Sequence, residues 1–406
     1  MPARPLIHIS VPPGPDGVSA LTSPLRAALD GTGPAIAPIP LVTDATSAEY
    51  VRHLLDATKP DDPSIPLEFD EVAVVMATSG STQRPKGVLH SASTLHALSN
   101  AVQGGAHPQW IAALPLTSMG GFNVVLRASE TELPAIGLNS LGGLQPFTSE
   151  DFVAAVRLAL HRSSDVRVSL VAAQVRRLLA DAAGTDALRA CSQILVGGGP
   201  LPASTADVAR TAEITLTTTY GATETAGGCV YNAQPLPGVD ITIDPDTSEI
   251  VLSGQMVALG YRDERTQTAA RFFGRSYRTG DLGTYSELLV IEGRSDDVIT
   301  INGVNVSLNA IEETLNNVAI VQLAAVVAQP DVNKELELYA AVTLVAGSLD
   351  ESEVVSMLRS AVQKELGKAA VPRKFAFFAE LPTLPNDKLD RRAITQLTHD
   401  GALWQR

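Results

Sequence analysis

Residues 78–87 read TSGSTQRPKG and place hydroxyl side chains, two glycines and a lysine directly after the apolar run EVAVVMA. Hydroxyl groups and an ammonium can bind phosphate oxygens, and glycines let the backbone change conformation. The segment is not a Walker A loop, GxxxxGK[ST], because no glycine stands directly before Lys86 and no Ser or Thr follows it. The sequence therefore predicts a phosphate-binding loop of another kind, and the alternative is a polar surface loop after a core strand.

A second segment whose side chains could bind a ligand, TTTYGATETAGG, covers residues 217–228. Tyr220 offers a flat ring that can stack on a base, and Gly221 lets the backbone approach a ligand. Thr223 and Glu224 add a hydroxyl and a carboxylate, the oxygen ligands that Mg²⁺ accepts while it bridges phosphates. Taken alone, the segment is better explained as a glycine-rich turn with a hydrogen-bonded tyrosine.

Three further segments carry charged groups in turns. YRTGDLG places Asp281 between glycine-containing turns, where a carboxylate can accept both hydroxyls of a ribose. GRSDDVITING follows with Arg294 and paired aspartates, and PNDKLDRRAI puts Lys388 in a turn before a final helix. A lone lysine in such a turn is usually solvated, so Lys388 gains meaning only from the other segments.

Alternating strand and helix patterns must position these groups, and they predict an α/β fold with a mainly parallel sheet. Ligands are expected at the carboxyl ends of the strands. The predicted strands are 71–77, 110–116, 166–172, 192–200 and 213–221. The predicted helices are 91–103, with a serine near its start, 151–162, and 172–184, which a glycine closes.

The pattern changes after about residue 234, where short β-branched runs broken by turn residues predict a small antiparallel or barrel-like β region. From residue 294 the order helix, strand, strand, helix, strand predicts a compact α+β unit. We expect a large N-terminal domain at 1–293, with parallel-rich sheets, helices and the small β region, and a small α+β domain at 294–406.

Composition restricts the class of protein. The chain has 406 residues, 45% hydrophobic and 18% charged, which is typical of a globular protein. Its net charge of −14 argues against a nucleic-acid binder, so a polyanionic ligand needs a local cluster of donors. The two cysteines are too few for a disulfide framework, and no secretory signal or transmembrane helix is expected. These features predict a cytoplasmic protein.

The five segments TSGSTQRPKG, TTTYGATET, YRTGDLG, GRSDDVITINGVNV and PNDKLDRR resemble, in this order, the signature motifs of the acyl-adenylate-forming superfamily. That superfamily includes acyl-CoA synthetases, peptide-synthetase adenylation domains and luciferases. The resemblance spans roughly residues 72–394. It implies that a carboxylic acid attacks ATP to give acyl-AMP and pyrophosphate, and that a thiol, usually that of coenzyme A, then displaces AMP. It also implies a small domain that rotates between the two half-reactions.

The resemblance implies a role for each matching residue. The ATP-binding set is Thr78, Ser79, Gly80, Ser81, Thr82, Lys86, Tyr220, Gly221, Asp281 and Arg294. Within it, the loop holds the β- and γ-phosphates, Tyr220 stacks on adenine, and Asp281 and Arg294 bind the ribose. The catalytic set is Lys388, Thr223 and Glu224, with Glu224 as the Mg²⁺ ligand, and Asp296 falls at the hinge.

A narrower resemblance joins SLVAAQVRRLL, ILVGGGPLP and TYGATETAGGCVYNAQPLPGV to the o-succinylbenzoate–CoA ligases of menaquinone biosynthesis. The glycines there would leave room for a flat aromatic acid, and the simpler interpretation is that they close turns. The implied acyl pocket consists of Ser118, Gly120, Gly121, Gly198, Gly199 and Gly228. Three residues depart from the family pattern: Gln83 and Asp387 replace glycines, and Ser118 replaces a histidine.

The resemblance thus predicts an acid–CoA ligase that uses ATP, CoA and Mg²⁺, acts on o-succinylbenzoate, and has neither a nucleic-acid partner nor a membrane span. A homodimer is expected from the family alone. The alternatives are a ligase for another aryl or short acyl acid, or an enzyme that passes the acyl group to a carrier protein. A more remote alternative is a non-catalytic nucleotide-binding module.

Overall fold

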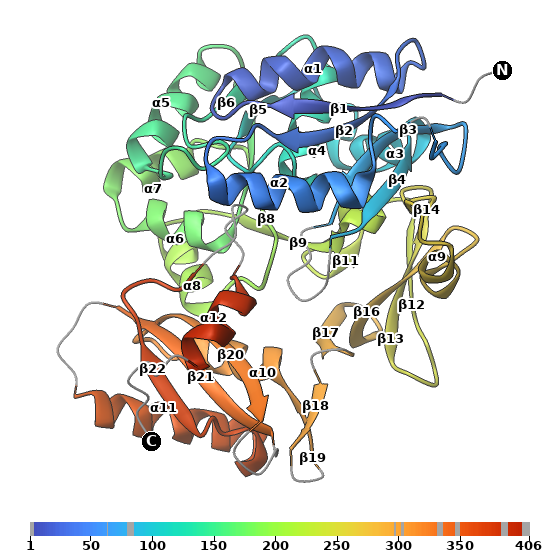
Figure 1. The fold of residues 1–406 in the computed structure, drawn as a ribbon. Coiled ribbons are helices and arrows are strands. Elements are labelled where there is room, and N and C mark those ends of the chain that lie inside the picture. The colour runs from blue at the N-terminus through green and yellow to red at the C-terminus, as the bar shows by residue number, and fades with distance from the viewer. Residues whose placement is uncertain are drawn as a thin grey trace.

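The computed structural model of the chain describes residues 4–62, 64–78, 85–295, 298–301, 304–330, 336–345, 350–382 and 389–399. Figure 1 shows a larger N-terminal part, which holds two helix-covered sheets, above a smaller C-terminal part. Among the helices of these residues, none has the length and apolar character needed to cross a membrane.

The first sheet of the N-terminal part has the strand order β1-β2-β3-β4-β14. The first three strands are parallel, whereas β4 and β14 are antiparallel to their neighbours. Residues 72–76 of β3 are almost completely buried, as their continuous apolar run predicts. The elements are β1 (Leu6–Val11), α1 (Asp16–Leu29), β2 (Ala35–Pro40), α2 (Ala45–Thr58), β3 (Val72–Ala77), β4 (Gly87–Ser91), α3 (Ala92–Gln103) and β14 (Gly260–Tyr261).

The second sheet has the order β11-β10-β9-β8-β7-β5-β6 and is parallel from β9 to β6. Its parallel strands are β5 (Gln109–Ala112), β6 (Ile136–Gly137), β7 (Val166–Leu170), β8 (Gln193–Val196) and β9 (Leu216–Ala222). The antiparallel strands are β10 (Gly227–Tyr231) and β11 (Gln234–Pro235). The helices are α4 (Met119–Ser129), α5 (Ser149–Leu160), α6 (Ala172–Leu179), α7 (Ala182–Arg189) and α8 (Ala203–Thr211), with the 3₁₀ turn η1 (Thr223–Thr225) after β9.

The predicted small β region is present and antiparallel, with the order β12-β13-β16-β15 and β17 paired to β16. Strand β12 alternates buried and exposed residues, as expected where one face packs on the core. The elements are β12 (Val239–Ile243), β13 (Glu249–Gly254), α9 (Arg265–Arg271), β15 (Phe272–Phe273), β16 (Ser276–Tyr285) and β17 (Leu289–Arg294).

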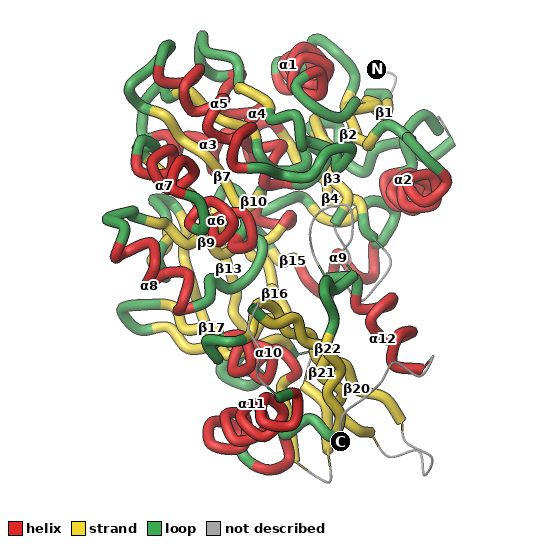
Figure 2. The backbone as a smooth tube through the Cα atoms, turned by 90° about the vertical axis from the view of Figure 1, so that its left-hand side faces the viewer, coloured by secondary structure: helices red, strands yellow, loops and turns green. Residues whose placement is uncertain are grey.

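The C-terminal part contains a β-hairpin, a three-stranded sheet in the order β20-β21-β22, and helices that cover the sheet. In Figure 2, α10 and α11 lie at the opposite end of the molecule from α1 and α2. The elements are β18 (Val298–Ile301), β19 (Val304–Ser307), α10 (Leu308–Asn316), β20 (Val321–Pro330), β21 (Leu336–Leu344), α11 (Glu351–Leu366), η2 (Lys368–Ala370), β22 (Lys374–Phe377) and α12 (Arg391–His399).

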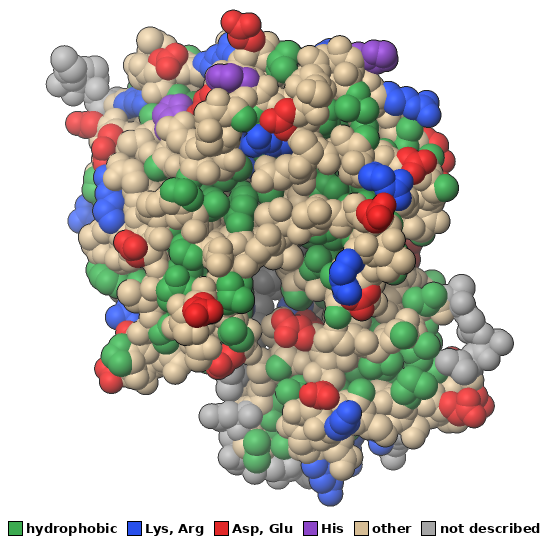
Figure 3. Space-filling model, turned by 180° about the vertical axis from the view of Figure 1, so that it is seen from behind, with side chains coloured by type: hydrophobic (Ala, Val, Ile, Leu, Met, Phe, Trp, Pro, Cys, Tyr) green, Lys and Arg blue, Asp and Glu red, His purple; other side chains and the backbone are tan. Residues whose placement is uncertain are grey.

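The two parts have separate hydrophobic cores among the described residues. The main core collects buried side chains between Val11 and Leu289, and a second core collects those between Ile301 and Phe375. Figure 3 shows a hollow between the larger and the smaller body. One contact between the parts is the hydrogen bond that Arg176 of α6 donates to the Gln322 carbonyl of β20 (2.5 Å). We propose that the domain boundary lies between residues 293 and 294.

The mixed α/β class predicted from the sequence is confirmed, and several element boundaries differ. The predicted helix 172–184 is wrong: it is split into α6 and α7, because the Asp181 side chain accepts the backbone hydrogen of Gly184 (2.8 Å) and starts a second helix. The predicted strand 110–116 ends at Ala112, before Pro115. The predicted strand 213–221 starts only at Leu216, as β9, and the positive φ of 58° at Glu213 does not fit a strand. Strand β4 was missed.

Candidate active site

The predicted phosphate loop leaves β3 and returns in β4, so it joins two antiparallel strands. The backbone hydrogen of Thr78 donates to the Lys86 carbonyl (2.8 Å), and that of Lys86 donates to the Thr78 hydroxyl (3.0 Å). Gly87 follows, where a Cβ would lie 2.7 Å from the Ala57 carbonyl, so only glycine fits the close packing. These bonds hold Lys86 at the neck of the loop. The predicted Ser79, Gly80, Ser81, Thr82 and Gln83 lie outside the described residues.

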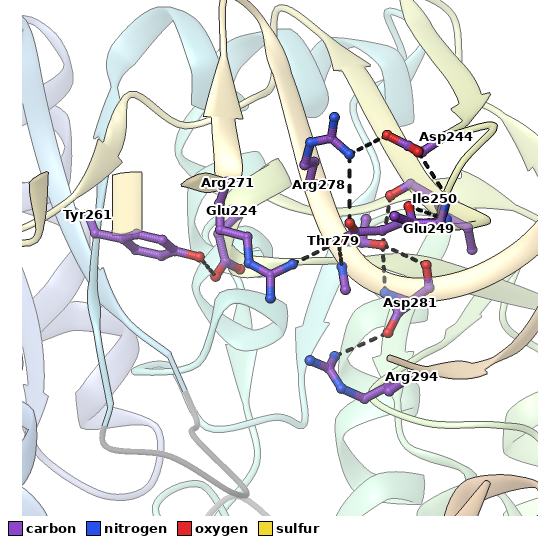
Figure 4. A network of polar contacts seen from close by, with 12 residues as sticks. Glu224, Asp244, Glu249, Ile250, Tyr261, Arg271, Arg278, Thr279, Asp281 and Arg294 are labelled. Carbon is purple, nitrogen blue, oxygen red and sulfur yellow. Dashed lines mark hydrogen bonds and ion pairs between the residues drawn. The ribbon is translucent and has the colours of Figure 1, made fainter. Parts of the chain in front are cut away.

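Lys86 is linked to Glu224 through Tyr261. The Nζ of Lys86 lies 4.9 Å from the centroid of the Tyr261 ring, and the Tyr261 hydroxyl donates to Oε1 of Glu224 (2.8 Å). Figure 4 shows this second contact. Strand β14 pairs Tyr261 with Val88 of β4, which brings the ring beside the loop. Burial and the Glu224 carboxylate raise the pKa of Tyr261, so the hydroxyl stays a donor.

The turn that carries Thr223 and Glu224 is held by buried contacts. Its residues form η1, and the next residue, Ala226, has a positive φ of 55°. The backbone hydrogen of Ala258 donates to the Glu224 carbonyl (2.9 Å). The Nε2 of His90 lies 2.9 Å from the Thr223 carbonyl. His90 is fully buried, and burial lowers its pKa to about 4, so the neutral ring donates from Nε2.

The predicted nucleoside residues meet in one network. The Tyr220 hydroxyl donates to Oδ2 of Asp281 (2.7 Å), and Nη1 of Arg294 donates to Oδ1 (3.1 Å). Asp281 and Arg294 are direct partners in the β16–β17 pairing, which explains why residues 13 apart in sequence meet. Figure 4 shows both residues beside the turn that contains Thr279.

Glu249 of β13 binds the backbone of the turn that precedes Asp281. Its Oε1 accepts the backbone hydrogen of Gly280 (2.6 Å) and a hydrogen of Arg271 (2.7 Å). Gly280 has a positive φ of 80°, which glycine adopts without strain, and Glu249 holds the turn that presents Asp281. Glu249, Tyr261 and His90 were all missed in the sequence, because none lies in a motif and each acts through contacts between separate strands.

The residues predicted for the acyl pocket have packing roles in the structure. Ser118 precedes α4 and its hydroxyl donates to the Pro115 carbonyl (2.7 Å). A Cβ on Gly121 would lie 2.3 Å from that carbonyl oxygen, and one on Gly228 would lie 2.9 Å from the Thr219 Cβ. A Cβ on Gly120 would lie 3.0 Å from Leu114 Cδ1, and Gly198 has a positive φ of 82°. Gly199 is the one of these five glycines whose added Cβ would meet no atom within 4 Å. Close packing therefore explains Gly121 and Gly228 directly.

Two predicted residues with special roles, Asp296 at the hinge and Lys388, lie outside the described residues, as does Asp387. The structure brings Lys86 close to Glu224, and it joins Tyr220 to Asp281 and Arg294. Strand β9 carries Tyr220 and leads into Glu224. The cluster around Glu224 and the cluster around Tyr220 therefore lie next to each other at the carboxyl end of this strand.

Glu224 is the described side chain whose chemistry suits Mg²⁺. It is 8% exposed, and its Oε1 accepts the hydrogen bond from Tyr261. The described residues contain no cluster of three His, Cys, Asp or Glu side chains that could hold a metal ion. A single carboxylate fits Mg²⁺, which is usually held by one or two carboxylates together with phosphates and water.

Comparison with known proteins gives two matching family models. The AMP-binding enzyme family matches residues 23–262, and the C-terminal domain of AMP-binding enzymes matches residues 310–388. A probable 2-succinylbenzoate–CoA ligase of Mycobacterium tuberculosis strain H37Rv is 31% identical over 396 residues, covering 96% of this chain and 97% of the relative.

Solved structures share the fold. The o-succinylbenzoate coenzyme A synthetase (MenE) from Bacillus subtilis, in complex with ATP and magnesium ion, has a TM-score of 0.72 and 21% identity, covering 97% of this chain and 90% of that one. The amide bond synthetase McbA from Marinactinospora thermotolerans has a TM-score of 0.75 and 22% identity, covering 98% and 90%. At these identities the likeness concerns the fold alone.

Proposed function

This chain belongs to the AMP-binding enzyme family, and on that premise we propose that it is a 2-succinylbenzoate–CoA ligase. The acid's carboxylate attacks ATP to form acyl-AMP and pyrophosphate, and the thiol of CoA then displaces AMP to form the thioester. The observation that carries the choice of acid is the end-to-end match to a relative of that name at 31% identity.

The geometry supports adenylation because it gathers charge where two anions must meet. A carboxylate and a polyphosphate repel each other, so donors fixed beforehand lower the barrier. Lys86, held at the neck of its loop, would bind the β- and γ-phosphates. Thr223 stands at the start of the turn, where its hydroxyl would contact the α-phosphate and the acid. Mg²⁺, when held by Glu224 and the phosphates, would supply further charge neutralisation.

The nucleoside would lie on the other side of that turn. The Tyr220 ring would stack on adenine, with Gly221 allowing the close approach, and Asp281 would accept the two ribose hydroxyls while Arg294 orients its carboxylate. The Tyr220 and Arg294 bonds reach different oxygens of Asp281 and fix the orientation of its carboxylate. Lys388, proposed from sequence alone, would bridge the acid and the α-phosphate.

A second candidate is a ligase for another aryl or short acyl acid, with transfer to CoA or to a carrier protein. Ser118 favours it, because it stands where the family resemblance implies a histidine and its hydroxyl is already bonded to the Pro115 carbonyl. A non-catalytic module is disfavoured, because Lys86, Glu224 and Asp281 are retained with their supporting contacts.

Incubation of the purified protein with ATP, Mg²⁺, CoA and a panel of acids tests the proposal. We expect pyrophosphate and a CoA thioester with 2-succinylbenzoate. Turnover with other acids but not with 2-succinylbenzoate would show that the substrate is a different acid. Pyrophosphate without a thioester would point to another acceptor, and no turnover with any acid would favour the binding module.

A further inference from the structure

Arg271, the last residue of α9, is a cation at the candidate site that belongs to none of the five sequence segments. Its side chain is 36% exposed, and its Nη1 donates a hydrogen bond to Oε1 of Glu249 (2.7 Å). Toward the residues that the structure describes, this is the hydrogen bond that the Arg271 side chain makes. A guanidinium carries several N–H donors and no acceptor, so Arg271 can bind a further anion.

The position of Arg271 is fixed by the aromatic residue that follows it. Phe272 pairs with Tyr277 between β15 and β16, and the centroid of its ring lies 5.0 Å from that of Tyr277. The Phe272 centroid also lies 5.1 Å from that of Tyr261, whose hydroxyl binds Glu224. This packing holds the end of α9 beside the contact between Tyr261 and Glu224.

The charge of Arg271 acts on that contact. Burial raises the pKa of the Tyr261 and Tyr277 hydroxyls, and the positive charge of Arg271 opposes this rise at both of them. Since a Coulomb interaction weakens with distance, the guanidinium must lie near both hydroxyls. In Figure 4 it lies between Glu224 and Thr279. Arg271 therefore faces the side of the site where the Mg²⁺ ligand stands.

On its other side, Arg271 meets the turn that presents Asp281. A Cβ on Gly280 would lie 3.2 Å from Nη1 of Arg271 and 3.4 Å from Nη2 of Arg294, so two guanidinium groups converge on this glycine. Arg294 also binds Asp281, at 3.1 Å between Nη1 and Oδ1. Two cations at such a short distance repel each other, so an anion between them is stabilised by both.

Glu249 neutralises Arg271 only in part. The oxygen that binds Arg271 also accepts the backbone hydrogen of Gly280 (2.6 Å), and the other oxygen lies 3.8 Å from Nη1 of Arg278. Arg278 has a second carboxylate partner, Asp244. Within the described part of the chain, Glu249 is the carboxylate that pairs with Arg271. Arg271 therefore shares its counter-ion and retains positive charge for a ligand.

We propose that Arg271 binds the α-phosphate of the nucleotide. This rests on the proposed function, in which Asp281 binds the ribose and Glu224 binds the Mg²⁺ that the phosphates share. The α-phosphate follows directly on the ribose, so in that arrangement it lies between these two carboxylates, as the Arg271 guanidinium does. A guanidinium binds two phosphate oxygens through parallel hydrogen bonds. Because the acid attacks the α-phosphorus, the same contact neutralises the charge that develops there.

A binding test measures this contact without acid, CoA or Mg²⁺. Isothermal titration calorimetry gives the dissociation constants of ATP, AMP and adenosine for the wild type and for Arg271→Met. We expect the constants of ATP and AMP to rise about tenfold, because a charge-assisted hydrogen bond to the α-phosphate is lost. The constant of adenosine, which has no phosphate, should not change. Arg265→Met removes an exposed arginine at the start of the same helix and is the control for all three ligands.

Two further variants distinguish phosphate binding from a role through Glu249. Glu249→Gln keeps an oxygen for the Gly280 amide and removes the negative charge beside Arg271. It should keep or increase the preference for AMP over adenosine, whereas Arg271→Met should remove most of it. Arg271→Lys keeps the charge but loses the paired donors, so it should lower the preference about threefold.

Four results would overturn the proposal. Equal weakening of adenosine and AMP in Arg271→Met would show that the residue only supports the turn before Asp281. Weakening of ATP without AMP would assign the contact to the β- or γ-phosphate, and unchanged constants would reject any phosphate contact. A preference for AMP that falls equally in Glu249→Gln and Arg271→Met would show that Arg271 acts through Glu249.

The same titrations separate this proposal from the proposed function. A wild-type protein that binds AMP but forms no thioester with any acid would reject the ligase, and the comparison of Arg271 variants would still decide the phosphate contact. A wild-type protein that binds none of the three ligands would reject both. If Arg271→Met does not fold, Arg271→Lys decides, and an unchanged preference for AMP in that variant would reject the proposal.

Discussion

The hydroxyl of Tyr220 donates a hydrogen bond to Oδ2 of Asp281 at 2.7 Å, across 61 residues of sequence. This bond ties the residue proposed to stack on adenine to the residue proposed to bind the ribose. Burial and the Asp281 carboxylate raise the pKa of Tyr220, so the hydroxyl remains a donor across the working range of pH.

Replacement of Tyr220 by phenylalanine keeps the ring and removes only this donor. We expect KM for ATP to rise about tenfold, because a hydrogen bond to a charged group contributes about 1.5–3 kcal/mol and part of it only orients Asp281. Tyr50→Phe on α2 serves as the control and should leave KM for ATP unchanged. An unchanged KM in Tyr220→Phe would show that Arg294 alone orients the carboxylate.

Tyr261 is expected to set the Mg²⁺ requirement through its bond to Glu224. Tyr261→Phe removes the hydroxyl and keeps the ring beneath Lys86, so the half-saturating Mg²⁺ concentration should rise roughly tenfold. Tyr261→Leu also removes the ring and should raise KM for ATP in addition. The two variants are compared by measuring pyrophosphate release against Mg²⁺ at fixed ATP. Identical effects of both would contradict separate roles for the hydroxyl and the ring.

His90 should make the folded state sensitive to acid. Its pKa is about 4 when folded and near 6.5 when unfolded, so the unfolded chain binds more protons between these values. Stability therefore falls as the pH falls from 6.5 toward 4, by about 2 kcal/mol between pH 7 and 5. Urea unfolding at pH 7 and at pH 5 measures the free energy of unfolding at each pH. In His90→Gln, the part of the decrease that is due to His90 should be absent.

His96 provides a control of opposite sign. Its hydrogen bond to Glu130 raises its pKa, so its contribution is present at low pH and is lost as the pH rises. His96→Gln should therefore increase the acid sensitivity, whereas His90→Gln should decrease it. The same direction for both variants would reject the assignment of His90 as a buried neutral donor.

Lys388 is expected to act in one half-reaction only. Lys388→Ala should reduce acyl-AMP formation at least 100-fold, because it removes the cation proposed to bridge the acid and the α-phosphate. Thioester formation from supplied acyl-AMP and CoA should change little. The two rates are measured separately in single-turnover experiments. An equal loss of both would contradict a domain that rotates between two arrangements.

The local chemistry was readable in the sequence because its residues are close neighbours along the chain. The order of the motifs, the α/β class and helices such as α3, whose first turn is capped by Ser91, all follow from short-range patterns. The split between α6 and α7 does not follow from the continuous helical pattern, because it depends on the capping side chain of Asp181 alone.

By itself, the sequence determined which groups are available: the lysine of the loop, the tyrosine and glutamate after β9, and the aspartate and arginine of neighbouring strands. Only the tertiary structure decided which of them touch. Tyr261 reaches Glu224 because β14 pairs with β4, and His90 reaches Thr223 because the loop returns as a strand. The physical reason is that strand pairing and burial depend on residues far apart in the chain, whereas motifs record only neighbours.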